Sequence, residues 1–166
     1  MSRMLSTKLL SLEQVAKLDG SIYALAAGTF DLFHYGHLRY LRSCAELAQR
    51  LCVGITEGRY IDKGPGRPVF KDDERIAMID SLYIVDAVVL VPDQTMVPLI
   101  EALRPAVYCK GSETRRDGNM NLVREMTAVN QGGGMTVFVN KTVPYSSGKL
   151  LSGEFWPTTR YKEGVT

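Results

Sequence analysis

The sequence IYALAAGTFDLFHYGHLRY, residues 22–40, changes its hydrophobic period near its middle. The apolar run of residues 22–27 is typical of a buried strand, and it ends at Gly28. From Gly36 onward, apolar residues recur at the spacing of one helical face: Leu38, Leu41, Ala45 and Ala48. The stretch therefore predicts a strand, a glycine turn and a helix.

The same alternation continues along the chain. Further strands are expected at four apolar runs: residues 51–56, 86–91, 106–109 and 135–139. Helices are expected to open at Asp72, to span Thr95 to Leu103 and Asn121 to Val129, and to begin once more at Ser146 or Ser147. Alternating strands and helices form a mostly parallel sheet with helices on both faces. We therefore predict an α/β fold with five strands, which binds ligands at their carboxyl ends.

The helix expected at Asp72 has a recognisable start. Three acidic residues open it, Asp72, Asp73 and Glu74, and they suit the positive end of the helix dipole. Helical spacing predicts an inner face made of Ile76, Ile79 and Tyr83.

Composition and charge exclude several classes of protein. Of the 166 residues, 45% are hydrophobic and 23% are charged, which is typical of a globular domain. A net charge of +2 argues against a nucleic-acid partner, and no apolar run is long enough to span a membrane. The three widely spaced cysteines indicate reduced thiols in a cytoplasmic chain, and the N-terminus shows no signal peptide.

His34 and His37, the two histidines of the chain, allow three interpretations. They are satisfied surface or core groups, they share a zinc ion, or they bind phosphate at the start of a helix. Zinc would need further ligands, and the sequence offers no third histidine and no paired cysteines. A glycine turn that leads from a strand into a helix exposes backbone N–H groups to an anion, and Gly36 leaves room for a phosphate.

The full string GTFDLFHYGHLRYL, residues 28–41, resembles the HxGH signature of the cytidylyltransferase-like nucleotidyltransferases. It is most similar to the glycerol-3-phosphate cytidylyltransferases and to the related sugar-phosphate (heptose) adenylyltransferases. The resemblance continues in four segments: DKGPGRPVF (62–70), DERIAMIDSLYIVDAVV (73–89), YCKGSE (108–113) and VPYSSGKL (143–150). It implies a Rossmann-like fold.

The resemblance also implies a reaction. A nucleoside monophosphate would be transferred from CTP to a phosphorylated polyol or sugar, with release of pyrophosphate. ATP is the second choice of donor. The acceptor phosphate would attack the α-phosphorus in line, so catalysis would consist of positioning and charge neutralisation. Mg²⁺ would be bound mainly through the nucleotide phosphates, without metal-ligating residues of the protein. The alternatives are a sugar- or heptose-phosphate adenylyltransferase and a nucleotide-binding module without catalysis.

The resemblance assigns roles to individual residues. Those expected to be catalytic are His34, His37 and Lys63. Those expected to bind the nucleotide are Gly28, Thr29, Phe30, Gly36, Lys110, Gly111, Lys141, Tyr145, Ser146 and Ser147. Those expected to bind the acceptor are Asp31, Arg67 and Arg75. Two of these residues have local alternatives. Asp31 would position the loop or the acceptor, or it would act only as a local capping group. Arg75 would meet the substrate phosphate, or it would only pair with Asp72.

Three positions depart from the pattern of the family. Lys141 replaces the usual arginine, Gly148 replaces a hydroxyl residue, and Gly58 stands where many relatives have an aspartate. The resemblance divides the chain into an N-terminal extension (1–19), a nucleotidyltransferase domain (20–153) and a C-terminal tail (154–166). Relatives are often dimers, so a homodimer is expected, with Phe155 and Trp156 as candidates to cover the partner.

Overall fold

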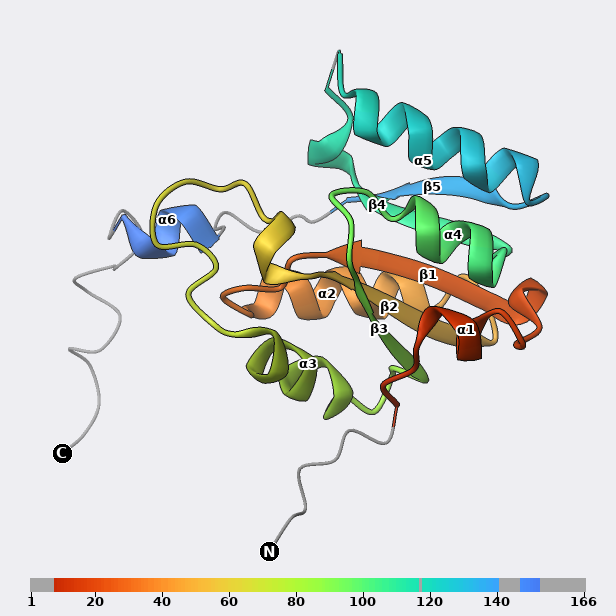
Figure 1. Cartoon of the computed structure of the whole chain (residues 1–166), viewed down its shortest axis with the longest axis horizontal. Helices are drawn as coiled ribbons and strands as arrows, with labels where there is room; N and C mark the ends of the chain where they lie inside the picture. The colour runs from red at the N-terminus through yellow and green to blue at the C-terminus, as the bar shows by residue number, and fades with distance from the viewer. Residues whose placement is uncertain (1–7, 117, 141–146, 153–166) are drawn as a thin grey trace, which may run out of the picture.

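The computed structural model describes residues 8–116, 118–140 and 147–152. Its centre is one parallel sheet of five strands in the order β3-β2-β1-β4-β5 (Figure 1). The strands are β1 (Tyr23–Gly28), β2 (Arg50–Thr56), β3 (Ala87–Val91), β4 (Val107–Gly111) and β5 (Met135–Val139). The α/β prediction is therefore confirmed, with every strand pairing parallel.

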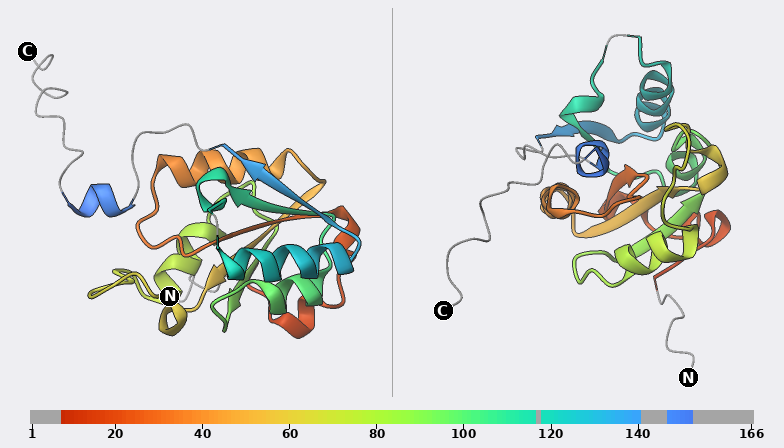
Figure 2. Two further views of the ribbon diagram at one scale, coloured as in Figure 1. Left: turned by 90° about the horizontal axis from the view of Figure 1, so that it is seen from above. Right: turned by 90° about the vertical axis from the view of Figure 1, so that its left-hand side faces the viewer.

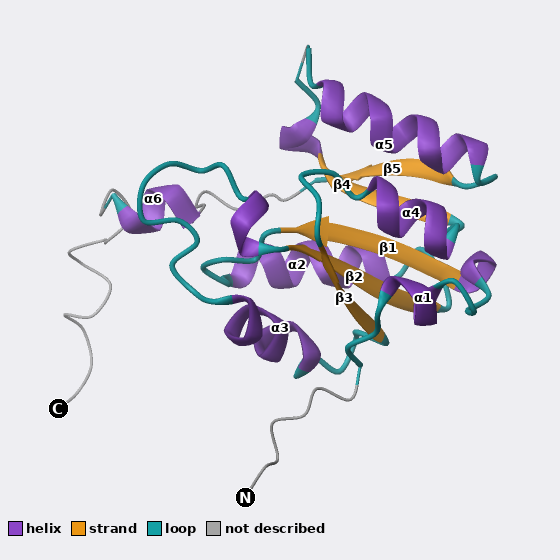
Figure 3. Cartoon of the chain, viewed as in Figure 1, coloured by secondary structure: helices purple, strands orange, loops and turns teal. Residues whose placement is uncertain are grey.

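Helices cover both faces of this sheet (Figures 2 and 3). The described helices are α1 (Leu12–Val15), α2 (Tyr35–Ala45), α3 (Asp72–Asp80), α4 (Val97–Leu103), α5 (Met120–Gln131) and α6 (Ser147–Leu151). The buried side chains of α2 and α3 form one hydrophobic cluster with the sheet, and those of α1, α4 and α5 form the other. Among the described residues, no helix has the length and apolar character needed to cross a bilayer.

The helix that opens at Asp72 is shorter than its inner face suggested. Ile76 and Ile79 are buried as predicted, but Tyr83 is 98% exposed, so that part of the prediction is wrong. The reason is that α3 ends at Asp80, before the spacing reaches Tyr83. Beyond the helix, the 100° rotation per residue no longer applies.

The segment before β1 packs on the domain that follows it. Leu9 forms a parallel bridge with Val88, and N–H groups on both sides donate across it over 2.8 Å. Val15 in α1 is fully buried in the same cluster as α4. Residues 8–10 therefore cover the outer edge of β3, which would otherwise be an unpaired edge strand.

The sheet opens at one point. The ladder between β1 and β4 ends at the pair Ala26 and Cys109, whereas β1 remains paired with β2 as far as Gly28. The carboxyl ends of β1 and β4 therefore separate in the middle of the sheet. This is the topological switch point, where open α/β sheets bind their ligands.

Candidate functional site

The turn after β1 is shaped by an aromatic ring. Phe30 has a left-handed backbone conformation, with φ at 46°, and its side chain is 1% exposed. A Cβ atom on Gly28 would lie 2.9 Å from that ring, closer than real Cβ contacts. Gly28 is therefore needed so that Phe30 can fold back against the end of the strand. Gly28, Thr29 and Phe30, the first three of the residues expected to bind the nucleotide, together form this turn.

The two histidines form the start of α2. His34 is the N-cap residue, and its Nδ1 atom accepts the N–H of Gly36 over 3.0 Å. In return, Nδ1 of His37 accepts the N–H of His34 over 3.3 Å. The ring centroids lie 4.0 Å apart. The predicted position of both histidines, at a helix start directly after β1, is thus the observed one.

This capping arrangement assigns the tautomer of both rings. A ring nitrogen that accepts a hydrogen bond carries no proton, so the proton of each neutral imidazole is assigned to Nε2. His37 is also held by aromatic neighbours, with Phe33 stacked at 5.7 Å and Phe30 edge-on at 5.4 Å between centroids. Each ring therefore has a fixed orientation and an N–H donor at Nε2. Among the described residues, no group of three or more His, Cys, Asp or Glu could hold a metal ion.

Lys63 reaches this turn from the loop after β2. Its Nζ atom donates to Oγ1 of Thr29 over 2.7 Å, although the two residues are 34 positions apart. Gly64 and Gly66 follow Lys63 with φ at +89° and +73°, in open space. The sequence predicted a functional lysine in this loop, and the structure places it against the turn after β1.

Asp31 holds the base of the same loop. Its side chain is 1% exposed and accepts the N–H groups of Val69 (2.8 Å) and Phe70 (3.0 Å). It also forms an ion pair with the guanidinium of Arg67. Burial alone would raise the pKa of the Asp31 carboxyl, but these hydrogen bonds and the Arg67 charge hold the pKa below its ordinary value. Asp31 therefore positions the loop that carries Lys63, which is one of the interpretations that the sequence left open.

Arg75 joins the ends of two strands. Its side chain is fully buried, and Nη1 donates to the carbonyl oxygens of Thr29 (2.6 Å) and Thr56 (2.9 Å). Its Nη2 atom forms an ion pair with Asp72, and its buried Nε has no partner among the described residues. The pairing with Asp72 considered from the sequence is present. These contacts fix the carboxyl ends of β1 and β2 relative to α3.

The glycine at position 58 has a local structural reason. Its N–H donates to Oδ1 of Asp72 over 2.9 Å, and a Cβ atom at Gly58 would lie 2.8 Å from that same oxygen. The carboxylate of Asp72 thus occupies the space that a side chain at position 58 would enter. A larger residue at this position would displace the partner of Arg75.

Lys110 lies near the end of β4, across the opening from the turn after β1, and its side chain is bound to other protein groups. Its Nζ atom lies 2.8 Å from Oε2 of Glu125 in α5, and the ammonium sits over the ring of Tyr108. The other oxygen of Glu125 accepts the N–H of Met96 over 2.9 Å. Glu125 is 3% exposed, so Lys110 neutralises a buried charge. Sequence reasoning missed Glu125 because a single acid in a helix carries no motif.

Two further features of the segment after β4 bear on the site. The carboxylate of Glu113 lies directly against Gly111 and fills the space that a Cβ atom would need there. A larger residue at position 111 would therefore have to displace the side chain of Glu113. The guanidinium of Arg115 lies 5.2 Å from the ring centre of Phe138, which connects this loop to β5. The contact between Arg115 and Phe138 has no signal in the sequence, because these residues lie 23 positions apart in different segments.

The last segment of the expected site is described only in part. Lys141, Tyr145 and Ser146 lie outside the described residues. Ser147 is the first residue of α6, so the short helix predicted from Ser146 or Ser147 is present. Gly148 lies in the same helix and is exposed.

Most of the described site residues meet at the turn after β1, whereas Lys110 and Gly111 lie at the end of β4 and Ser147 lies in α6. Thr29 receives Lys63 on its side chain and Arg75 on its carbonyl oxygen, and His34 and His37 follow five and eight residues later. Together these residues supply N–H donors and cations at a helix start. Such a site can bind and neutralise a polyphosphate.

Comparison with known proteins places the chain among relatives. A family model described as cytidylyltransferase-like matches residues 25–151. The Bifunctional protein HldE of Campylobacter fetus subsp. fetus is 31% identical over 142 residues, which are 81% of this chain and 31% of that protein. The HldE of Gluconobacter oxydans is 32% identical over 153 residues, or 87% of this chain and 31% of that protein. This chain thus spans about a third of the length of these relatives.

A solved structure supports the same relationship. The crystal structure of the lipopolysaccharide core biosynthesis protein from Thermoplasma volcanium GSS1 matches with a TM-score of 0.58 and 25% sequence identity. The match covers 73% of this chain and 96% of that one. The shared part is therefore nearly the whole of that smaller protein.

Proposed function

Because this chain belongs to the cytidylyltransferase-like family of nucleotidyltransferases, we propose that it transfers an adenylyl group from ATP to a phosphorylated sugar of the heptose class, with release of pyrophosphate. The sequence alone favoured CTP and placed this reaction second. The relatives favour the second reaction, since those cited are HldE proteins and the solved neighbour is named for lipopolysaccharide core biosynthesis. The observation that carries the proposal is the convergence of His34, His37 and Lys63 on the turn at the switch point.

The chemistry requires little of the protein beyond position and charge. An oxygen of the acceptor phosphate, already ionised near neutral pH, attacks the α-phosphorus and forms a new P–O bond. The bond from the α-phosphorus to the bridging oxygen breaks, and its electron pair leaves with pyrophosphate. The Nε2–H groups of His34 and His37 and the ammonium of Lys63 would hydrogen-bond the phosphate oxygens on which charge accumulates.

Lys63 would exchange partners during this reaction. In the structure its ammonium donates to a neutral hydroxyl, that of Thr29. A phosphate oxygen carries negative charge and attracts an ammonium more strongly than a neutral hydroxyl oxygen does. Nucleotide binding would therefore draw Lys63 away from Thr29, while Asp31 keeps the base of the loop in place.

The residues expected to bind the acceptor are bound mainly to the protein itself. Arg67 is 11% exposed and paired with Asp31, and Arg75 has both terminal nitrogens bound to protein oxygens. We therefore propose that these two arginines, with Asp31, shape the acceptor pocket chiefly by holding its walls. Mg²⁺ would be held by the nucleotide phosphates and water, because the described residues form no carboxylate cage for it.

One of the three departures that suggested a module without catalysis, Gly58, has a structural explanation. Gly58 departs from the pattern of relatives, but here its space is filled by Asp72, so the departure belongs to an intact local structure. A homodimer also remains a proposal, and light scattering on the purified chain would test it.

A screen for pyrophosphate release tests the proposal. The protein is incubated with Mg²⁺ and each of the four nucleoside triphosphates, against a panel of heptose, hexose and polyol phosphates. We expect release with ATP and a heptose phosphate. Nucleotide binding without release for any pair would support the binding module instead.

A further inference from the structure

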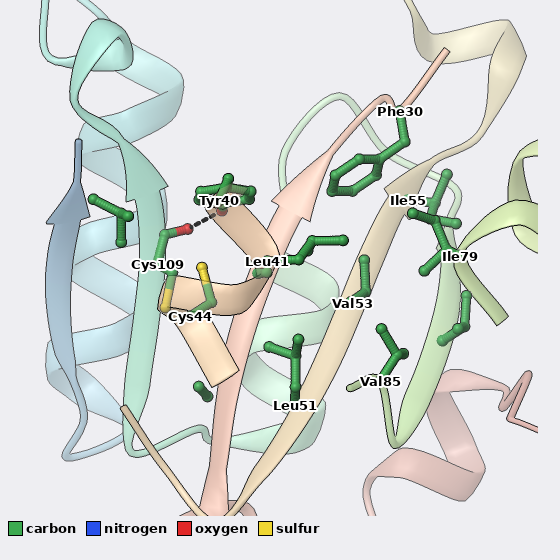
Figure 4. Packing of buried hydrophobic residues seen from close by; sticks show 14 of the residues in the cluster. Phe30, Tyr40, Leu41, Cys44, Leu51, Val53, Ile55, Ile79, Val85 and Cys109 are labelled. Atoms are coloured by element: carbon green, nitrogen blue, oxygen red, sulfur yellow. Dashed lines mark hydrogen bonds between the residues drawn. The ribbon is translucent and has the colours of Figure 1, made fainter. Parts of the chain in front are cut away.

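The opening between β1 and β4 is bridged by a hydroxyl group. Tyr40, from α2, points its side chain into the gap just beyond the last pair of the ladder, Ala26 and Cys109 (Figure 4). Its oxygen accepts the N–H of Ala27 over 3.2 Å and donates to the carbonyl oxygen of Cys109 over 2.8 Å. The hydroxyl thus takes the place of the ladder hydrogen bonds that the two strands no longer make.

The environment of this hydroxyl keeps it neutral. The side chain of Tyr40 is 2% exposed and packs with Leu41 and Cys44 in the cluster beneath the sheet. Burial, reinforced by the neighbouring Cys44 and Cys109, raises the pKa of the Tyr40 phenol well above its ordinary value. The group therefore retains the proton that it donates to Cys109 across the physiological range.

The three segments that meet at this hydroxyl are those that form the candidate site. Ala27 directly precedes the turn of Gly28 and Thr29, and Cys109 directly precedes Lys110. His37 lies three residues before Tyr40 on α2, a spacing that places the two side chains on one face of the helix. Any change in the position of Tyr40 would therefore shift these segments relative to one another.

We propose that Tyr40 is a positioning residue that sets the width of the switch-point opening, so that a nucleotide bound between β1 and β4 meets His37 in register. This inference rests on the proposed function for the identity of the ligand, whereas the geometry it uses is that of the protein's own residues. Without the hydroxyl, the N–H of Ala27 and the carbonyl of Cys109 lose their shared partner. They would then pair more directly or admit water, and either change alters the opening.

The test compares Tyr40→Phe with Tyr23→Phe. Both substitutions remove one phenolic oxygen from a buried tyrosine, but Tyr23 lies at the amino end of β1, away from the opening. We expect Tyr40→Phe to lower kcat/KM for the nucleotide by about ten-fold to a hundred-fold, since displacement on the order of 1 Å has effects of that size. The KM for the acceptor should change little, and Tyr23→Phe should match the wild type in every kinetic parameter. A Tyr40→Phe protein with lower Tm but unchanged kinetics would overturn the proposal, because it would show a purely structural hydroxyl.

Two further measurements keep the inference separate from folding and from the proposed reaction. If the wild type shows no turnover, calorimetric binding of ATP and CTP to both variants replaces the kinetics, and equal affinities for the wild type and Tyr40→Phe would contradict the inference. If Tyr40→Phe does not fold, amide hydrogen exchange is measured in the wild type without nucleotide. Slow exchange at Ala27 is expected from its bond to Tyr40, and exchange at the rate of an exposed amide would contradict it.

Discussion

Lys63 Nζ lies 2.7 Å from Oγ1 of Thr29, so the loop after β2 directly contacts the turn after β1. The lysine is exposed and is flanked by Gly64 and Gly66, both with positive φ. Asp31 fixes the other end of the same loop to the same turn. The cation is thereby held beside the helix start that carries both histidines.

Replacing Lys63 by methionine should lower kcat by about a hundred-fold, because one preorganised charge on the leaving pyrophosphate is lost. Methionine retains most of the apolar length of the side chain, so the fold should be unaffected. Steady-state pyrophosphate release and thermal unfolding would measure both effects. The control is Lys17→Met, which removes an exposed lysine paired with Glu13. Equal turnover of the two variants would remove Lys63 from the mechanism.

The two nitrogens of His37 can be tested separately. In His37→Asn, the amide oxygen can replace Nδ1 as acceptor for the N–H of His34, but no donor remains at the position of Nε2. We expect this variant to fold normally and to lose about a hundred-fold or more in kcat. His37→Gln, whose amide extends to the position of Nε2, should recover part of that loss. Circular dichroism and turnover are the measurements, and near-normal turnover of His37→Asn would contradict the assigned role.

The lowered pKa of the Asp31 carboxyl predicts how the free energy of unfolding depends on pH. The pKa of its carboxyl is lowered in the fold from an ordinary value of 3.8, so the folded state favours the ionised form. Its stabilising contribution is therefore complete above the unfolded pKa and is lost as the pH falls through the lower, folded value. Urea unfolding from about pH 2 to about pH 6 should show a smaller acid loss in Asp31→Asn than in the wild type. Parallel curves for the two proteins would show that Asp31 contributes no such linkage.

Gly58→Ala should destabilise the fold by about 1–3 kcal/mol, because the new Cβ atom would displace the carboxylate of Asp72 from Arg75. Denaturant unfolding measures the effect. In an Asp72→Ala background the same substitution should cost clearly less, since the clashing oxygen is gone. An equal cost in both backgrounds would mean that the strain arises elsewhere.

The strands and most helices could be predicted because their signals are local. The run of residues 22–27 and the change to helical spacing at Gly36 correspond to β1 and α2 within one or two residues. Tyr83 failed because hydrophobic spacing does not mark where a helix ends, and α3 stops at Asp80. α1 was missed because four residues are too few to show a helical period.

Only part of the candidate site could be predicted from the sequence. The family resemblance pointed to His34, His37 and Lys63, because all three lie in short segments that match family motifs. The sequence could not show that Asp31 holds the loop of Lys63, because Asp31 binds Val69, which lies 38 residues away in the chain. It could not show that Glu125 holds Lys110 either, because these two residues are 15 positions apart. Tyr40 carried no signal either, since its role depends on where two strands separate.

The central claim is transfer of an adenylyl group to a sugar phosphate, and one competition experiment tests it most directly. ATP and CTP are supplied together at equal concentration with Mg²⁺ and a heptose phosphate, and the products are identified by mass spectrometry. We predict an ADP-linked sugar that forms in step with pyrophosphate and is absent with His37→Asn. A CDP-linked product in its place, or no nucleotide-linked sugar at all, would contradict the account.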